Sequence, residues 1–217
     1  MDRVLEPEIM DGDAEAAAYA SADFSDSNAA YVAGVVGAFP GLRRIVDLGC
    51  GPGDVAVRLA TALPPAHITA VDGSAAMLAL ARRAVEAAGV GGQVTLVQGR
   101  LPGVMLEAPF DAVLSKDMLH HLPDPQVLWS EVRRLGRPGA AVCVADLMRP
   151  DSPWEARAIV ERVSGGEDPL LKEDFYNSLC AAFTVEEAQA QLEAADLPLT
   201  VERLTERHMR IRGRLPG

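Results

Sequence analysis

Two acidic residues flank a run of closely spaced glycines, and this combination is suited to binding a ligand that carries positive charge. The glycines are Gly49, Gly51 and Gly53, and the acidic residues are Asp47 and Asp54. Glycines at alternate positions permit a tight turn and a close approach to a ligand, where a Cβ would clash. The two carboxylates make a poor cradle for a pyrophosphate, but they suit a ligand with an amino group and a sulfonium.

The stretches on either side of the glycines predict where this turn lies in the fold. The apolar run at residues 45–48 predicts a buried strand. Residues 55–63 predict a helix that Asp54 caps and that Pro64 and Pro65 end. A strand, a glycine turn and a helix N-terminus form a nucleotide-binding corner at the carboxyl end of a parallel sheet. A P-loop is excluded because no Gly-Lys-Ser/Thr follows, and the dinucleotide pattern GxGxxG would require glycine at position 54.

A third carboxylate, Asp72, ends the next predicted strand at residues 67–72. An acidic residue about 20 positions beyond such a glycine turn binds the ribose hydroxyls in Rossmann-like folds. Enzymes that use NAD have the same feature, and a strand-end cap is the structural alternative. Met77, on the following predicted helix, and Met118 are candidates to sandwich an adenine ring, with core packing as the alternative.

The stretch from Val46 to Asp54 resembles the first motif of the class I S-adenosylmethionine (SAM) methyltransferases, and the resemblance extends from about Arg44 to Leu147. The sequence LHHLPDP at residues 119–125 is similar to that of many small-molecule methyltransferases. The resemblance implies transfer of a methyl group from SAM to a small-molecule acceptor, with S-adenosylhomocysteine (SAH) as the other product. Three alternatives remain open: an enzyme that modifies SAM itself, a non-catalytic SAM-binding protein, and an NAD-dependent oxidoreductase.

The resemblance also implies which residues hold the cofactor. Asp47 and the glycine turn would hold the methionine part of SAM, and Asp72 the ribose. The implied cofactor-binding residues are Asp47, Gly49, Cys50, Gly51, Gly53, Asp72, Gly73, Met77, Gly99, Arg100, Leu101 and Ser115. Relatives usually carry an acidic residue where this chain has Arg100, which leaves the backbone around residues 99–101 to contact the adenine edge.

Candidates for the catalytic side follow the predicted fourth strand. His120 is favoured to face the transferred methyl group, with packing of the loop as its alternative. Asp117 and His120 are candidate general bases. The adjacent side chains of His120 and His121 are expected to point to different sides, so we expect no shared metal site.

Lys116 is the third catalytic candidate, at a position where relatives have a small polar residue. Together with Arg149, it is expected to bind an anionic group of the acceptor, because both follow strands at the carboxyl edge of the sheet. An exposed loop lysine is the alternative. Tyr19, Phe24 and Tyr31 are candidate lid residues, and the two tyrosines are further candidate bases.

The order of elements predicts a doubly wound, Rossmann-like α/β fold with a seven-stranded, mostly parallel sheet. The segments at 199–204 and 208–211 follow each other without a helix between them, which predicts a C-terminal antiparallel hairpin. Helices are expected within residues 14–38, as part of an N-terminal lid over residues 1–40, and in an insertion at residues 149–182. Three aromatic residues of the insertion are expected either to pack its core or to line an acceptor pocket: Trp154, Phe175 and Tyr176.

Length and charge limit the remaining possibilities. A chain of 217 residues with 49% hydrophobic content is expected to form one domain, 1–217. The net charge of −11 argues against non-specific nucleic-acid binding, which depends on neutralising phosphates. No leader or membrane-spanning run is recognised, and three scattered cysteines fit a reducing compartment, so a cytoplasmic monomer or homodimer is expected.

Overall fold

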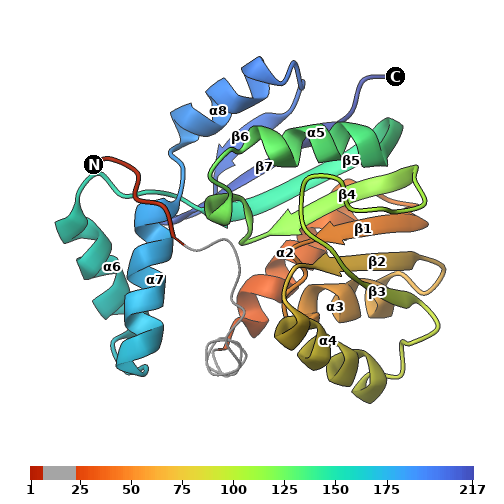
Figure 1. Ribbon diagram of the computed structural model, residues 1–217, viewed down its shortest axis with the longest axis horizontal. Helices are drawn as coiled ribbons and strands as arrows, with labels where there is room; N and C mark the ends of the chain where they lie inside the picture. Colours follow the sequence, from red (N-terminus) through yellow and green to blue (C-terminus); the bar gives the residue numbers. More distant parts are fainter. Residues whose placement is uncertain (7–22) are drawn as a thin grey trace.

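A sheet covered by helices on both faces organises the molecule (Figure 1). The computed structural model describes residues 1–6 and 23–217. The strands are β1 (Arg44–Leu48), β2 (His67–Asp72), β3 (Val94–Gln98), β4 (Phe110–Lys116), β5 (Gly136–Leu147), β6 (Thr200–Arg203) and β7 (His208–Arg214). Their order in the sheet is β3-β2-β1-β4-β5-β7-β6. The first five are parallel, and β7 is antiparallel to both of its neighbours. The predicted doubly wound fold with a terminal hairpin is confirmed.

The helices cover the sheet and its carboxyl edge. Those of the described residues are α2 (Ser25–Ala38), α3 (Asp54–Ala62), α4 (Ala75–Ala87), the short 3₁₀ helix η1 (Leu119–His121), α5 (Gln126–Leu135), α6 (Pro153–Ser164), α7 (Pro169–Ala181) and α8 (Val185–Ala194). The helix predicted within residues 14–38 is described from residue 25 onward. Its earlier part, with Tyr19, lies outside the described residues. None of the described helices is both long enough and apolar enough to span a membrane.

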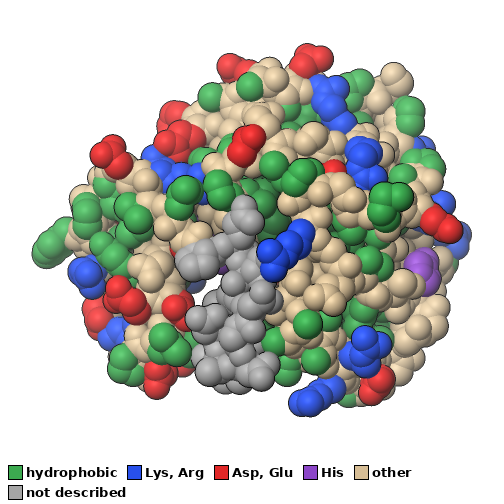
Figure 2. All heavy atoms as spheres, viewed as in Figure 1, with side chains coloured by type: hydrophobic (Ala, Val, Ile, Leu, Met, Phe, Trp, Pro, Cys, Tyr) green, Lys and Arg blue, Asp and Glu red, His purple; other side chains and the backbone are tan. Residues whose placement is uncertain are grey.

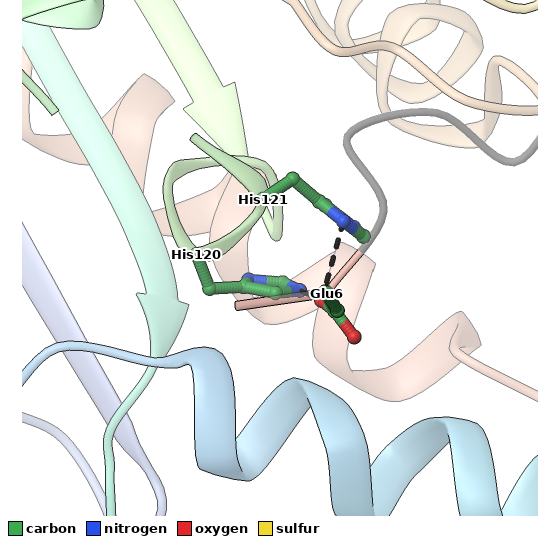
Figure 3. Close-up of side chains that lie close together, drawn as sticks. All are labelled: Glu6, His120 and His121. Carbon is green, nitrogen blue, oxygen red and sulfur yellow. Dashed lines mark ion pairs between the residues drawn. The ribbon is translucent and has the colours of Figure 1, made fainter. Parts of the chain in front are cut away.

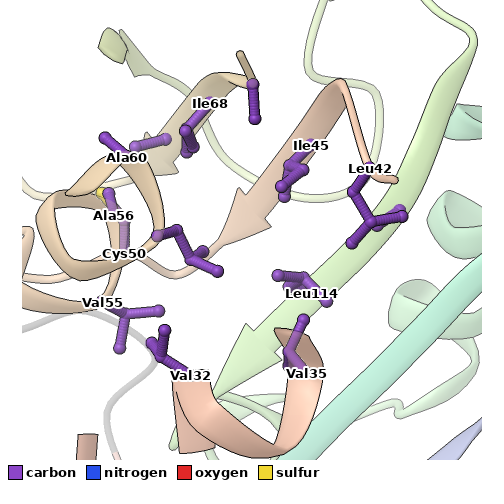
Figure 4. Packing of buried hydrophobic residues seen from close by; sticks show 14 of the residues in the cluster. Val32, Val35, Leu42, Ile45, Cys50, Val55, Ala56, Ala60, Ile68 and Leu114 are labelled. Carbon is purple, nitrogen blue, oxygen red and sulfur yellow. The ribbon is translucent and has the colours of Figure 1, made fainter. Parts of the chain in front are cut away.

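Both faces of the sheet are apolar, and successive side chains of each strand point to alternate faces. Ile45 faces one hydrophobic cluster and its neighbour Val46 faces the other, because successive side chains of a strand point to opposite sides. Helices α2, α3 and α4 pack on the first face, and Figure 4 shows α2 and α3 against β1, β2 and β4. Helices α5 and α8 pack on the second face, where Trp129 is fully buried. These two cores fix the strand ends that carry the site.

Helices α6 and α7 form a separate layer beside the end of β5 (Figure 1). They have a hydrophobic cluster of their own, which includes Leu147, Ile159 and Leu179. Within the predicted aromatic group, Phe175 and Tyr176 pack against this cluster. The expectation for Trp154 is wrong, because it is 81% exposed and contributes neither to this core nor to the main cavity.

Two local predictions differ from the structure. The apolar run at residues 140–147 predicts a strand, but β5 begins four residues earlier, at Gly136, because α5 runs directly into it. Asp54 is the first residue of α3 and not its cap, a position taken by Gly53 with a φ of 86°. The Asp54 carboxylate instead accepts hydrogen bonds from Arg58 at 2.6 Å and from Asn28 at 2.9 Å. The bond from Asn28 joins α2 to the helix that follows the glycine turn.

Candidate active site

A cavity of about 390 Å³ opens at the carboxyl edge of the sheet. It lies where the strand order reverses between β1 and β4, the usual ligand position in an open α/β sheet. Its size falls within the range of small-molecule sites. The predicted cofactor residues that line it are Asp47, Gly49, Cys50, Gly51, Asp72, Gly73, Met77, Gly99, Arg100 and Leu101. Gly53 and Ser115 are close by in the sequence but do not line the cavity.

The glycine turn after β1 has no room for side chains at two positions. Gly49 has a φ of 73°, and a Cβ added there would lie 2.4 Å from the Met118 Cγ. Gly53 packs against α4, where an added Cβ would lie 2.9 Å from the Cβ of Ala81. These contacts explain why glycine is required: Gly49 brings the turn against the loop after β4, and Gly53 lets α3 approach α4.

Asp47 places a buried carboxylate on the cavity. Its side chain belongs to β1 and is 1% exposed, and its Oδ2 has no hydrogen-bond partner among the described residues. Burial and the neighbouring Asp72 carboxylate raise the pKa of Asp47 to about 7, against the opposing effect of Lys116. A buried polar atom without a partner costs free energy, so this oxygen is suited to a cationic or hydrogen-bond-donating ligand.

Asp72 organises the turns on both sides of the cavity. Its Oδ2 accepts a hydrogen bond from the Gly51 backbone N–H at 2.8 Å, and its Oδ1 accepts one from the Ser74 N–H at 2.8 Å. Each carboxylate oxygen has a second lone pair. Asp72 can therefore hold the two turns and still accept hydrogen bonds from a ligand diol.

The end of β4 contributes charged groups from the opposite side. Lys116 and Asp117 form an ion pair, and both line the cavity. The side chain of Lys116 is only 9% exposed, so the alternative of an exposed loop lysine is wrong. Asp117 adopts a φ of 55°, a strained backbone conformation of the kind that clusters at functional sites. Its backbone N–H donates to the Ala145 carbonyl oxygen at 2.9 Å, which anchors the turn.

The prediction that the two adjacent histidines point to different sides is wrong, because their ring centroids lie 4.3 Å apart and both rings approach Glu6 Oε1. Their other contacts differ. His120 is buried and does not line the cavity, and its Nδ1 lies 2.6 Å from Asp146 Oδ1. Burial would lower the pKa of His120, but the carboxylates of Asp146 and Glu6 raise it to about 9. His121 lines the cavity. Sequence reasoning favoured His120 for that position, because nothing in the pair indicates which ring the η1 turn directs inward.

Other predicted residues are held by the protein itself. Arg149 is buried and donates hydrogen bonds to the Ala182 carbonyl and to the Glu187 carboxylate, so it does not join Lys116. The Tyr31 hydroxyl donates to the Cys143 carbonyl oxygen at 2.8 Å. Ser115 donates to the Leu48 carbonyl at 2.8 Å. These bonds connect elements of the fold to one another.

Some residues near the cavity were missed. The start of α2 lines it with Asp23, Phe24, Ser25 and Asn28, of which only Phe24 was anticipated as a lid residue. The contacts of Glu6 with the histidine loop were also missed, because Glu6 is more than 100 positions away in the sequence and lies outside any recognisable motif. Long-range contacts of this kind leave no periodic signal.

Comparison with known proteins agrees with this geometry. Residues 45–139 match the family model of the methyltransferase domain. A trans-aconitate 2-methyltransferase of Azoarcus sp. is 35% identical over 148 residues, 63% of this chain and 55% of that protein. A release factor glutamine methyltransferase of Gloeobacter violaceus is 42% identical over 92 residues, 42% of this chain and 32% of that protein. The chain thus spans about half or less of the length of these two relatives.

Solved structures extend the likeness to nearly the whole chain. A SAM-dependent methyltransferase from Aquifex aeolicus superimposes with a TM-score of 0.67 over 94% of this chain and 98% of that one, at 17% identity. At this identity the likeness concerns the fold. The family model thus matches residues 45–139, and the fold of the wider chain is that of a solved SAM-dependent methyltransferase.

Proposed function

We propose that the protein transfers a methyl group from SAM to a small-molecule acceptor bound in the cavity at the carboxyl edge of the sheet. The observation that carries the proposal is the buried Asp47 carboxylate, whose Oδ2 lacks a hydrogen-bond partner among the described residues, on a cavity that Asp72 also lines. A cofactor with an ammonium group and a ribose diol matches these two carboxylates. A dinucleotide would bring a pyrophosphate to the same turn, where both charges would repel it.

In this proposal, different residues of the cavity bind different parts of the cofactor. Asp47 accepts from the ammonium group, and the backbone at Gly49 and Gly51 approaches the methionine part. Asp72 accepts from the ribose hydroxyls, and Gly73, Met77, Gly99, Arg100 and Leu101 line the same cavity on the adenine side. SAM supplies a methyl group on a sulfonium that is already activated for transfer. The protein then needs to align the acceptor and to exclude water.

The acceptor side is assigned to the residues after β4. Lys116 binds an anionic group of the acceptor, and Asp117 is the candidate base where the acceptor arrives protonated. His120 faces away from the cavity and contacts Asp146, so we assign it a positioning role in the loop. The start of α2, with Phe24 and Asn28, covers the cavity as a lid.

Two observations favour a small-molecule acceptor. The Azoarcus relative is named for a small tricarboxylate, which is consistent with a lysine on the acceptor side. In addition, the Lys and Arg side chains on the face in Figure 2 are scattered among acidic and apolar ones and form no continuous basic surface over its described part. This distribution and the net charge of −11 disfavour a nucleic-acid substrate.

Ligand-induced stabilisation tests the cofactor. SAM or SAH at about 100 times its Kd should raise the unfolding free energy by about 2.7 kcal/mol and increase the Tm, whereas NADH should not. Asp72→Asn should weaken this effect for both adenosyl ligands. Stabilisation by NADH alone would overturn the proposal.

The acceptor assignment has its own test. Lys116→Met should raise the acceptor KM and leave the Kd of SAM nearly unchanged. Unchanged KM and kcat for the acceptor would refute the role of Lys116. Methylation of a release-factor peptide, with no turnover of small carboxylates, would replace the small-molecule acceptor by a protein one.

A further inference from the structure

A carboxylate and two imidazoles meet beside the active-site cavity, although they come from distant parts of the chain. Glu6 belongs to the N-terminal segment, and His120 and His121 form the end of η1 (Figure 3). Glu6 Oε1 lies 3.3 Å from the Nε2 of His120 and 3.2 Å from the Nδ1 of His121. One ligand atom from each residue lies within 4.8 Å of the other two.

Two of these separations match those of ligands around one metal ion. Ligand atoms at about 2.0–2.1 Å from a tetrahedral Zn²⁺ lie about 3.3 Å from one another. The distances from Glu6 Oε1 to the two imidazole nitrogens have this value. Two imidazoles and one carboxylate favour divalent transition metals over Mg²⁺ and Ca²⁺, which prefer oxygen ligands.

The surroundings of His120 orient its ring for such a role. Its Nδ1 lies 2.6 Å from Asp146 Oδ1, and the other oxygen of Asp146 accepts from the Leu119 N–H at 2.7 Å. A carboxylate that holds the proton on Nδ1 leaves Nε2 as the ring nitrogen that can bind a metal, as in metal-bound histidines, and the ion displaces the Nε2 proton. Nε2 of His120 is the nitrogen that faces Glu6.

The carboxylate itself is buried and incompletely bonded. Its Oε2 accepts from the Ser178 hydroxyl at 3.2 Å, whereas its buried Oε1 makes no hydrogen bond among the described residues and has only the two imidazoles within ion-pair distance. The segment that carries it is firmly attached. Arg3 donates to the carbonyl oxygens of His120, Leu122 and Ala181 at 2.5–2.9 Å. A cation between the three groups would satisfy this buried oxygen, which the imidazoles approach without forming hydrogen bonds.

We infer that Glu6 Oε1, His120 Nε2 and His121 Nδ1 bind a divalent transition-metal ion such as Zn²⁺. This site goes beyond the proposed function, because metal binding requires neither SAM nor an acceptor. Three protein ligands leave a coordination position for water or for an oxygen of a small molecule. His121 also lines the cavity, so the ion adjoins the space in which the acceptor is proposed to bind.

Titration of the chelator-treated full-length protein with Zn²⁺ tests the inference, by calorimetry in the absence of SAM. One ion should bind per chain, and Mg²⁺ should not compete. Co²⁺ should give the visible absorption of a low-coordinate nitrogen and oxygen site. Glu6→Gln and His121→Asn alter opposite sides of the site, and each should weaken Zn²⁺ binding by more than about 100-fold. Loss of a residue that only contacts a metal ligand weakens binding by about 10–100-fold, so the larger effect distinguishes a ligand from such a residue.

His67→Asn is the matched control, because His67 is exposed and bonds Thr95 away from this cluster. It should leave Zn²⁺ binding unchanged. Circular dichroism establishes that each variant is folded before titration. Absence of stoichiometric binding by the parent protein would overturn the inference. Glu6, His120 and His121 would then form ion pairs with one another and hold no metal. Equal binding by Glu6→Gln, His121→Asn and the parent would also overturn it.

Discussion

Replacing Asp47 by asparagine should make the protein more stable and its cofactor binding weaker, and both changes should depend on pH. The pKa of Asp47 is raised to about 7, chiefly by burial and then by the Asp72 carboxylate, with Lys116 opposing. In the unfolded chain the same carboxyl ionises near pH 4. Between these values the folded state holds one proton more than the unfolded state, so this residue makes stability decrease as pH rises from about 4 to 7.

The magnitude follows from the difference between the two pKa values. A pKa of about 7 against the usual value near 4 corresponds to about 4 kcal/mol of unfolding free energy above pH 7. Asparagine has nearly the same shape and does not ionise. Asp47→Asn should therefore be more stable than the parent by up to about 4 kcal/mol at pH 8, with a smaller difference at pH 5.

Urea unfolding of both proteins without ligand from pH 5 to 8 measures this difference, and contributions from other titrating groups cancel in the comparison. Calorimetry with SAM gives the functional counterpart. The parent should bind SAM about tenfold more weakly at pH 6 than at pH 8, because Asp47 must lose its proton. The variant should bind weakly at both values. A variant that is less stable than the parent at pH 8, by an amount that does not vary with pH, would refute this reasoning.

Five further variants test the fold and the site. Gly49→Ala should lower the unfolding free energy by about 2–4 kcal/mol, because the added Cβ would meet a methionine side chain at 2.4 Å. Gly51→Ala, with open space around it, should lower it by only about 1–2 kcal/mol. Thermal unfolding measures both changes. Trp129→Ala removes a fully buried side chain and should lower the unfolding free energy measured in urea by about 3–5 kcal/mol. Trp154 is 81% exposed, so Trp154→Ala should change the same free energy by no more than about 0.5 kcal/mol. Tyr31→Phe loses one buried hydrogen bond and should cost about 1 kcal/mol with kcat unchanged; a tenfold fall in kcat would instead assign the hydroxyl to catalysis.

The sheet could be predicted because its signals are local and mutually consistent. The apolar run at residues 45–48 and the two adjacent strands at the C-terminal end fall close to β1 and to the β6–β7 hairpin. Element boundaries were less accurate where capping decided them. Gly53, in a left-handed conformation, occupies the N-cap position of α3, where Asp54 was expected because aspartate is a good cap.

The candidate site could be predicted only in part from the sequence. Asp47, Asp72 and the glycines could be located because one strand–turn–helix unit and the next strand end fix their positions. The orientation of His120 and His121 depends on a three-residue 3₁₀ turn, and the partner of Arg149 is Glu187 on α8. Such contacts join segments without shared periodicity, so single-sequence patterns carry no information about them.

The separate core of α6 and α7 has an evolutionary consequence. Changes at positions that share no contacts contribute almost independently to stability. Mutations in the interior of this pair of helices, as at Ile159, are therefore largely uncoupled from the packing beneath the sheet, where the residues around Ile45 and Val46 hold the strand ends in register. Such an arrangement lets one part of a protein diversify quickly while another is preserved. Substitutions in the interior of the helical layer should thus leave the glycine turn unaltered.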